Sequence, residues 1–141
     1  MRRKLFAAVV AFGLCGTVMP VLAHHSFAAE FDADKPVKLT GAVTRVEWIN
    51  PHSWIHMDVK GPDGTVENWM VEGGTPNALV RRGFSKNSLL PGTIIVVDGF
   101  RSKDGKLKAN GRDVTFPDGR KLFLGSSGTG APEDGKDPGA K

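Results

Sequence analysis

Apolar and polar residues alternate along several stretches of this chain, with the period of two that half-buried β-strands show. Such alternation covers residues 37–48 and 53–60, and further strand-like stretches cover 65–72, 93–100, 107–116 and 121–124, of which the run 94–97 is apolar on both faces. In the first stretch the alternation changes phase near Thr44-Arg45, which predicts a β-bulge at that point. Turn residues such as Gly61-Pro62-Asp63-Gly64 separate the stretches. The pattern therefore predicts a mainly β domain.

One short helix interrupts the predicted strands. Thr75 is a typical N-cap residue, Pro76 suits the first helical position, and Gly83 suits the end of the helix. Three strands, a helix and then two strands is the element order of the OB-fold, a small Greek-key barrel. We therefore expect a small OB-fold-like barrel of five to six strands with one short helix between strands 3 and 4. An open all-β meander with one helix is the alternative.

Residues 1–23 have the three-part pattern of a secretory signal peptide. A basic start precedes an apolar run, and Val21-Leu22-Ala23 suits cleavage after Ala23. Glycines and a proline shorten the apolar run below the roughly 20 residues of a spanning helix, which favours cleavage over an uncleaved anchor. A lipid on Cys15 is disfavoured because the large residue Leu14 precedes it. We expect a periplasmic protein that has no transmembrane segment after cleavage.

The rest of the chain divides into three parts by its composition. Residues 24–36 form an N-terminal arm before the first predicted strand, and residues 37–124 form the expected OB-like β-domain. Residues 125–141 are rich in Gly and Pro and contain no large apolar side chain. Such a segment buries too little surface to offset its ordering entropy, so we expect a disordered tail.

Removal of the predicted signal peptide changes what the composition implies. The 141-residue chain has 19 basic and 15 acidic residues and one cysteine. Cleavage after Ala23 removes three basic residues and the cysteine, which leaves 16 basic against 15 acidic residues. Without a cysteine, the mature chain can form neither a disulfide nor a multi-cysteine zinc site. Its near-zero net charge makes nucleic acid a poor candidate partner.

Five sequence blocks occur together in this chain. They are HHSF at 24–27, VEWINPHSW at 46–54, EGGTPN at 72–77, RRG at 81–83 and PDGRKLF at 117–123. The combination resembles a family of small exported bacterial proteins that is catalogued only as a domain of unknown function. The resemblance covers residue 24 to about residue 132. It implies a periplasmic location and an OB-like β-domain in Gram-negative bacteria, and it implies no activity.

Two of the four histidines lie at the expected mature N-terminus. Cleavage after Ala23 gives His24 a free α-amine beside its own imidazole, and His25 follows. Both kinds of nitrogen lose their protons near neutral pH, so little free energy is needed to deprotonate them before they bind a metal. An amine and an imidazole on one residue form a chelate, and with one more imidazole they suit Cu(II), which favours tetragonal nitrogen ligands. The alternative is a solvated chain end without a ligand.

The other two histidines lie in the block from Asn50 to Met57. If a strand begins by His52, its alternation puts His52, Trp54 and His56 on one face. In an OB-fold this face and the first inter-strand loop form the usual ligand surface. We therefore take Asn50, His52 and Trp54 as candidate ligand-binding residues, with His52 also a candidate third metal ligand beside His24 and His25. The alternative is structural: His52 caps a turn, and His56 is an ordinary cross-strand partner.

No catalytic motif accompanies these residues. The mature sequence has no thiol, no Gly-x-Ser-x-Gly, no phosphate loop and no closely spaced carboxylate pair in an apolar setting. We therefore predict a binding module without catalytic residues, whose candidate cofactor is copper. The alternative is a non-metal accessory module that binds an envelope protein or a small ligand through the Trp54/His52 face.

Overall fold

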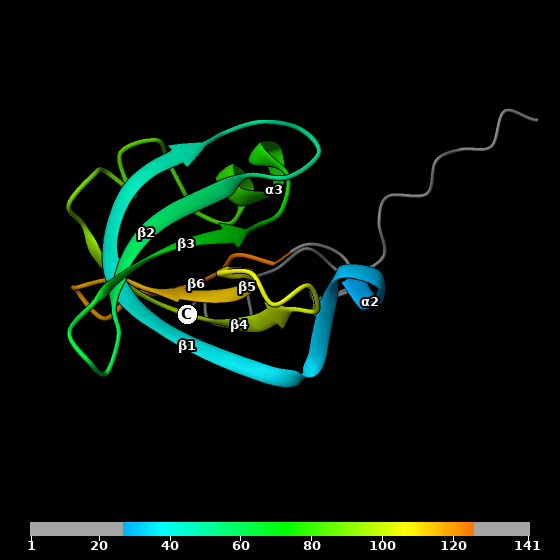
Figure 1. The fold of residues 1–141 in the computed structure, drawn as a ribbon. Coiled ribbons are helices and arrows are strands. Elements are labelled where there is room, and N and C mark those ends of the chain that lie inside the picture. The colour runs from blue at the N-terminus through cyan, green and yellow to red at the C-terminus, as the bar shows by residue number, and fades with distance from the viewer. Residues whose placement is uncertain (1–26, 126–141) are drawn as a thin grey trace, which may run out of the picture.

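The computed structural model describes residues 27–125, which form one sheet and two short helices (Figure 1). The elements are α2 (Phe27–Glu30), β1 (Phe31–Glu47), β2 (Trp54–Lys60), β3 (Val66–Glu72), α3 (Pro76–Arg81), β4 (Ile94–Ser102), β5 (Lys108–Thr115) and β6 (Lys121–Phe123). The expected signal peptide, residues 24–26 of the arm and residues 126–141 of the expected tail lie outside the described residues. Within 27–125, no helix has the length and apolar character needed to cross a membrane.

Hydrogen bonds connect five of the six strands into a ring. The strand order is β3-β2-β1-β4-β5-β6, and an additional pairing joins β3 to β5. That closing pair is parallel, whereas the other neighbours are antiparallel. β6 extends the sheet beyond β5. The predictions of a mainly β fold and of a short helix between β3 and β4 are confirmed.

β1 is the long bent strand to which both halves of the ring attach (Figure 1). Its first part pairs with β4 and its second part with β2. The register against β2 shifts between Val43 and Arg45, which confirms the predicted bulge. The strand begins at Phe31, six residues before the predicted start at Val37, because the pairing with β4 continues to Phe31 across an irregular stretch.

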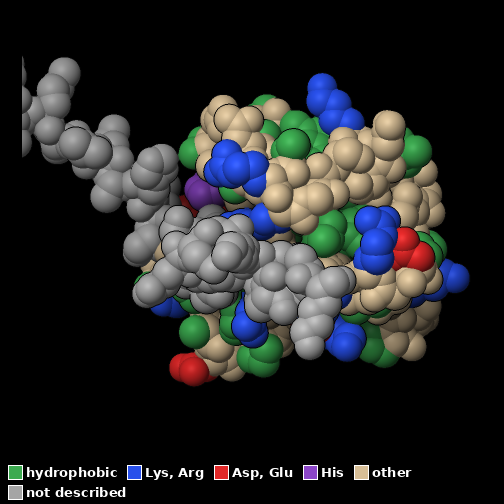
Figure 2. Space-filling model, turned by 180° about the vertical axis from the view of Figure 1, so that it is seen from behind, with side chains coloured by type: hydrophobic (Ala, Val, Ile, Leu, Met, Phe, Trp, Pro, Cys, Tyr) green, Lys and Arg blue, Asp and Glu red, His purple; other side chains and the backbone are tan. Residues whose placement is uncertain are grey.

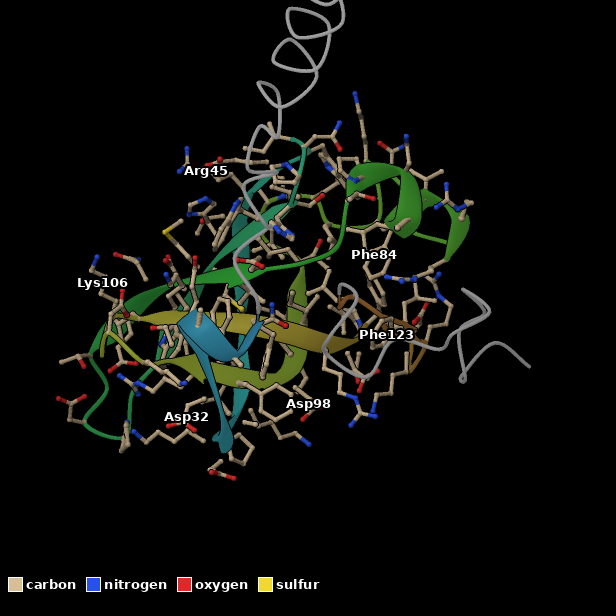
Figure 3. The ribbon with its side chains drawn as sticks, turned by 90° about the vertical axis from the view of Figure 1, so that its right-hand side faces the viewer. Asp32, Arg45, Phe84, Asp98, Lys106 and Phe123 are labelled. Carbon is tan, nitrogen blue, oxygen red and sulfur yellow. The ribbon has the colours of Figure 1, made fainter. Side chains whose placement is uncertain are left out.

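The ring encloses one hydrophobic core. Alternate residues of the strands point inward, so Ile55, Met57, Val71 and Val97 are fully buried. The buried residues that pack together are Leu39, Val43, Ile55, Met57, Trp69, Val71, Leu79, Phe84, Leu89, Ile95, Val97, Ala109, Val114, Phe116 and Leu124. Phe84 lies beside α3 (Figure 3).

The helix between β3 and β4 begins and ends where its sequence predicts. The Thr75 hydroxyl accepts a hydrogen bond from the Ala78 amide at 3.3 Å, and Pro76 takes the first helical position. Gly83 follows the helix with a φ of 97°, a conformation that favours glycine. The helix buries Leu79 against the core.

Gly41 of β1 has no room for a side chain beside β2 and offers a test of this arrangement. A Cβ atom at Gly41 would overlap the carbonyl oxygen of Asp58. We expect Gly41→Ala to lower the free energy of unfolding by about 1–3 kcal/mol, because the strands must separate. Thr44→Ala, at an exposed position of the bulge, should change it by less than about 0.5 kcal/mol. Urea unfolding measures both, and equal values would contradict the close approach.

Candidate functional site

A row of paired residues crosses four strands on the outer face of the sheet. Trp54 of β2 pairs with Glu72 of β3, Glu72 with Asn110 of β5, and Asn110 with Phe100 of β4. Paired residues lie on the same side of a sheet. The chain neighbours Ile55 and Val71 belong to the core, so this row lies on the opposite, outer side. The predicted residue Trp54 thus lies beside the Glu72 carboxylate, and the next residue of the row is Asn110; the sequence singled out neither.

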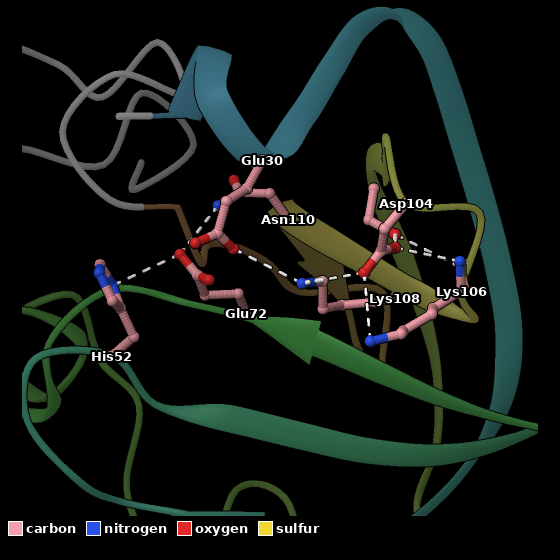
Figure 4. A network of polar contacts seen from close by, with 8 residues as sticks. Glu30, His52, Glu72, Asp104, Lys106, Lys108 and Asn110 are labelled. Atoms are coloured by element: carbon pink, nitrogen blue, oxygen red, sulfur yellow. Dashed lines mark hydrogen bonds and ion pairs between the residues drawn. The ribbon is translucent and has the colours of Figure 1, made fainter. Parts of the chain in front are cut away.

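His52 lies at one end of this row, just before β2. Its Nδ1 is 3.3 Å from the Gly73 carbonyl oxygen and 3.6 Å from Glu72 Oε1 (Figure 4). A carbonyl oxygen only accepts hydrogen bonds, so Nδ1 carries the proton that is donated to Gly73. The neutral ring then has its lone pair on Nε2. About a quarter of the side chain is exposed, and Nε2 is the nitrogen left to bind a ligand.

Glu72 and Asn110 are buried although they lie on the outer face. Glu72 is 8% exposed and Asn110 is 2% exposed. Asn110 Nδ2 donates a hydrogen bond of 3.4 Å to Glu72 Oε1. Asn110 Oδ1 has no hydrogen-bond partner among the residues that the structure describes. The row therefore contains the buried Glu72 carboxylate, which accepts a long hydrogen bond from Asn110 Nδ2. Beside it lies Asn110 Oδ1, an acceptor without a described donor.

α2 covers the other end of the row. The Phe27 ring packs edge-on against Phe100 at 5.4 Å and stacks on Phe31 at 5.9 Å. Lys103 Nζ donates a hydrogen bond of 2.6 Å to the Ala28 carbonyl oxygen. These contacts hold Glu30, the last residue of α2, above β5 near Asn110 (Figure 4).

An ion-pair network continues from Glu30 along β5. Lys108 Nζ lies 3.5 Å from Glu30 Oε2 and 3.8 Å from Asp104 Oδ2. Lys106 Nζ also contacts Asp104, at 3.6 Å. Figure 4 shows this chain of contacts leading toward Glu72 and His52. The arrangement joins α2, the end of β3 and the β4–β5 turn in one polar cluster.

Burial raises the pKa of the Glu72 carboxyl above its usual range. Loss of hydration is the largest cause, and the nearby charge of Glu30 adds to it. The charges of His52 and Lys108 and the hydrogen bond from Asn110 act in the opposite direction. Desolvation of the carboxylate therefore outweighs the favourable charges around it.

The remaining predicted residues lie apart from this cluster or outside the described chain. Asn50 is exposed in the loop between β1 and β2. His56 Nε2 is 2.8 Å from Glu47 Oε1 and 3.2 Å from an Arg45 nitrogen, so it already has partners. His24 and His25 lie outside the described residues. Within 27–125, no three His, Cys, Asp or Glu side chains are grouped so as to hold a metal.

Basic side chains do not gather in one patch on the described part of the face opposite that of Figure 1. Where Figure 2 shows described residues, Lys and Arg side chains are scattered among apolar and uncharged ones. Among the described residues, Lys38 pairs with Asp98 at 3.9 Å and Lys121 with Asp113 at 3.6 Å.

Sequence comparison assigns the chain to a family. The profile described as "Family of unknown function (DUF6152)" matches residues 13–111, which is more than half of the chain. The chain belongs to the DUF6152 family. Glu30, His52, Glu72, Lys108 and Asn110 all fall within the DUF6152 match. No curated protein and no solved structure matches the chain.

The raised pKa of Glu72 predicts how its removal changes stability with pH. Because the folded state binds the proton more tightly than the unfolded state, the ionised carboxylate costs stability as pH rises above about 4.3. We expect Glu72→Gln to raise the melting temperature at pH 7 by a few degrees, with the gain vanishing near pH 4. Thermal unfolding in a metal chelator measures this.

Asp118→Asn is the control with the opposite sign. Hydrogen bonds from Arg120 hold the pKa of the exposed Asp118 carboxyl below its usual range. The Asp118 carboxylate therefore stabilises the folded state at neutral pH, and this stabilisation is lost as pH falls. At pH 7 the variant should melt at a lower temperature than the parent protein. A Glu72→Gln protein that melts earlier at pH 7 and recovers at pH 4 would contradict the assignment.

Proposed function

We propose that this protein is an exported, periplasmic binding module that holds a copper ion with the processed N-terminal residue. The α-amine and imidazole of His24 form the chelate, and imidazoles of His25 and His52 complete the nitrogen ligands. Such a nitrogen set suits Cu(II). The proposal includes no catalytic residue.

The arrangement of His52 is the observation that carries this proposal. Metal-binding histidines commonly donate the second ring N–H to a backbone carbonyl or a carboxylate, which fixes the tautomer and the ring orientation. His52 has both kinds of acceptor at Nδ1, Gly73 at 3.3 Å and Glu72 at 3.6 Å. His56 does not share this arrangement, because its Nε2 contacts Glu47 and Arg45. Of the two histidines that the structure describes, only His52 makes its contacts through Nδ1, which leaves Nε2 for a ligand.

The position of α2 supports a role for His24 and His25. His24 is three residues before Phe27, so the chain between them spans at most about 11 Å. Phe27 begins the helix whose last residue, Glu30, lies in the cluster with Glu72. The proposal requires the mature chain end to extend from Phe27 along the outer face toward His52.

Acetylation of the N-terminus tests the chelate directly. We expect the chain that begins at His24 to bind Cu(II) tightly and the same chain with an acetylated His24 α-amine to bind at least about a hundredfold more weakly, since an amide nitrogen is no longer an amine ligand. Calorimetry against a competing chelator measures both affinities. Unchanged affinity in the acetylated chain would refute the proposal.

A pair of histidine variants tests the third ligand. We expect His52→Ala to lower the Cu(II) affinity of the mature chain at least about tenfold, in the range found when metal-site residues are removed. His56→Ala, four residues further along in β2, is the matched control, and it should leave the affinity unchanged. Equal affinities of the two variants would exclude His52 as a ligand.

The alternative function uses the same face without a metal. Trp54 is half-buried beside Glu72, and an aromatic ring next to a carboxylate suits an organic ligand or a partner side chain. A ligand that binds the chelator-treated protein and is lost in Trp54→Ala would favour this function. Copper dependence of the same binding would favour the first.

A further inference from the structure

A hollow of about 530 Å³ lies on the outer face of the sheet, lined by residues of β1, β4, β5 and β6. A row of paired residues crosses it, in which Lys38 pairs with Asp98 and Asp98 with Asp113. The chain neighbours Val97 and Val114 belong to the core, so this row faces outward. The volume of the hollow is in the range of small-molecule sites, and its described lining does not include His52.

A second, apolar row borders the same hollow. Pro36 of β1 pairs with Phe100 of β4, each two residues along its strand from a member of the charged row. Residues two apart in a strand lie on the same face, about 7 Å from each other. The Phe100 ring is held in place by Phe27, which packs edge-on against it at 5.4 Å. The hollow therefore has a charged side and an apolar side.

Positive charge exceeds negative charge on the charged side. The Nζ atom of Lys38 lies 3.9 Å from Asp98, and the Arg112 Nε and Lys121 Nζ atoms lie 3.8 and 3.6 Å from Asp113. These distances are longer than hydrogen bonds, so the three cations keep N–H donors for a ligand. Two carboxylates balance three cations in the described lining, which leaves one positive charge.

A β-bulge brings Arg112 to the hollow. Asp98 pairs with Asp113 but Gly99 pairs with Gly111, so Arg112 is an extra residue without a partner in β4. Such a bulge changes the direction of a side chain relative to a regular strand. The Arg112 carbonyl oxygen accepts hydrogen bonds from the amides of residues 124 and 125, at 2.7 and 3.2 Å, which fixes its backbone.

We propose that this hollow binds a small organic monocarboxylate that has an apolar body. A guanidinium group such as that of Arg112 donates two parallel hydrogen bonds to a carboxylate, and the apolar body packs on the Pro36 and Phe100 side. One negative charge neutralises the excess positive charge. A dianion such as a phosphate monoester would add an unbalanced charge beside Asp98 and Asp113. The inference is independent of the proposed copper site.

Naphthalene-2-carboxylate is the probe, because its rigid ring system carries a single carboxylate. We titrate it into the protein in the presence of a metal chelator and follow the backbone amides by NMR. We expect saturable binding with a dissociation constant of about 1 mM or lower, with the largest shifts at Gly99 and Arg112. Naphthalene-2-carboxamide, which lacks the charge, should bind at least about tenfold more weakly. Absence of saturation, shifts elsewhere, or equal affinity for the carboxamide would each overturn the inference.

A pair of cation variants tests the role of Arg112. Its side chain is about half exposed, so Arg112→Gln keeps the packing of the core. We expect this variant to bind the probe about tenfold more weakly, because a charged hydrogen-bond donor is lost. Lys106→Gln removes an exposed cation that pairs with Asp104 at 3.6 Å outside the hollow, and it should leave the affinity unchanged. Equal losses in the two variants would show a general attraction of charge and would contradict a site in the hollow.

Asp113→Asn should change the affinity in the opposite direction. The substitution removes the carboxylate that competes with the probe for Arg112 and Lys121. We therefore expect the probe to bind about threefold more tightly, as the loss of one exposed ion-pair partner allows. Unchanged or weaker binding by a folded Asp113→Asn protein would overturn the inference.

Discussion

Three residue pairs between β3 and β5 hold together both the ring of strands and the candidate site. Met70 pairs with Lys108, Val71 with Ala109, and Glu72 with Asn110. The middle pair is fully buried in the core, and the last pair lies on the outer face. Because side chains alternate between faces, a register shift of one residue would turn Glu72 into the core and Val71 outward. Packing of the core therefore also fixes the position of the Glu72 carboxylate.

Glycines beside this pairing allow the chain to pack closely. A Cβ atom at Gly111 would overlap the side chains of Val71 and Leu124, and one at Gly73 would overlap Leu124. Leu124 is wholly buried at this end of the ring. Gly73 also supplies the carbonyl oxygen that accepts from His52, so the backbone that packs against Leu124 orients the imidazole as well. Orientation of His52 and closure of the core are thus linked through one residue.

Much of this fold follows from local sequence patterns. The alternation predicts the strands, the phase change predicts the bulge between Val43 and Arg45, and Thr75 with Pro76 predicts the start of α3. Each of these signals depends on residues that are neighbours in the chain. The early start of β1 has no such signal, because the stretch before Val37 is polar and becomes a strand only by pairing with β4.

The candidate site was predicted only in part for the same reason. His52 and Trp54 stand out by residue type, and alternation correctly puts Trp54 on the face opposite Ile55. Glu72 and Asn110 look ordinary in sequence, since one ends a strand and the other lies within a polar run. They become notable only because β3 and β5, with α3 and β4 between them in the chain, lie side by side. That contact depends on the pairing of strands that are distant in the chain. The residue pattern of a single strand does not predict it.

Burial of Glu72 needs a reason beyond the stability of the fold. The core lies on the other face of β3, where Val71 and Trp69 pack, so the ring does not depend on a charge at Glu72. An apolar side chain of similar size there would avoid the desolvation that raises the pKa of this carboxyl. His52 lies next to this carboxylate with Nδ1 turned toward it and toward Gly73. The carboxylate of Glu47 beside His56 is one-third exposed, so water screens its charge more than that of the buried Glu72.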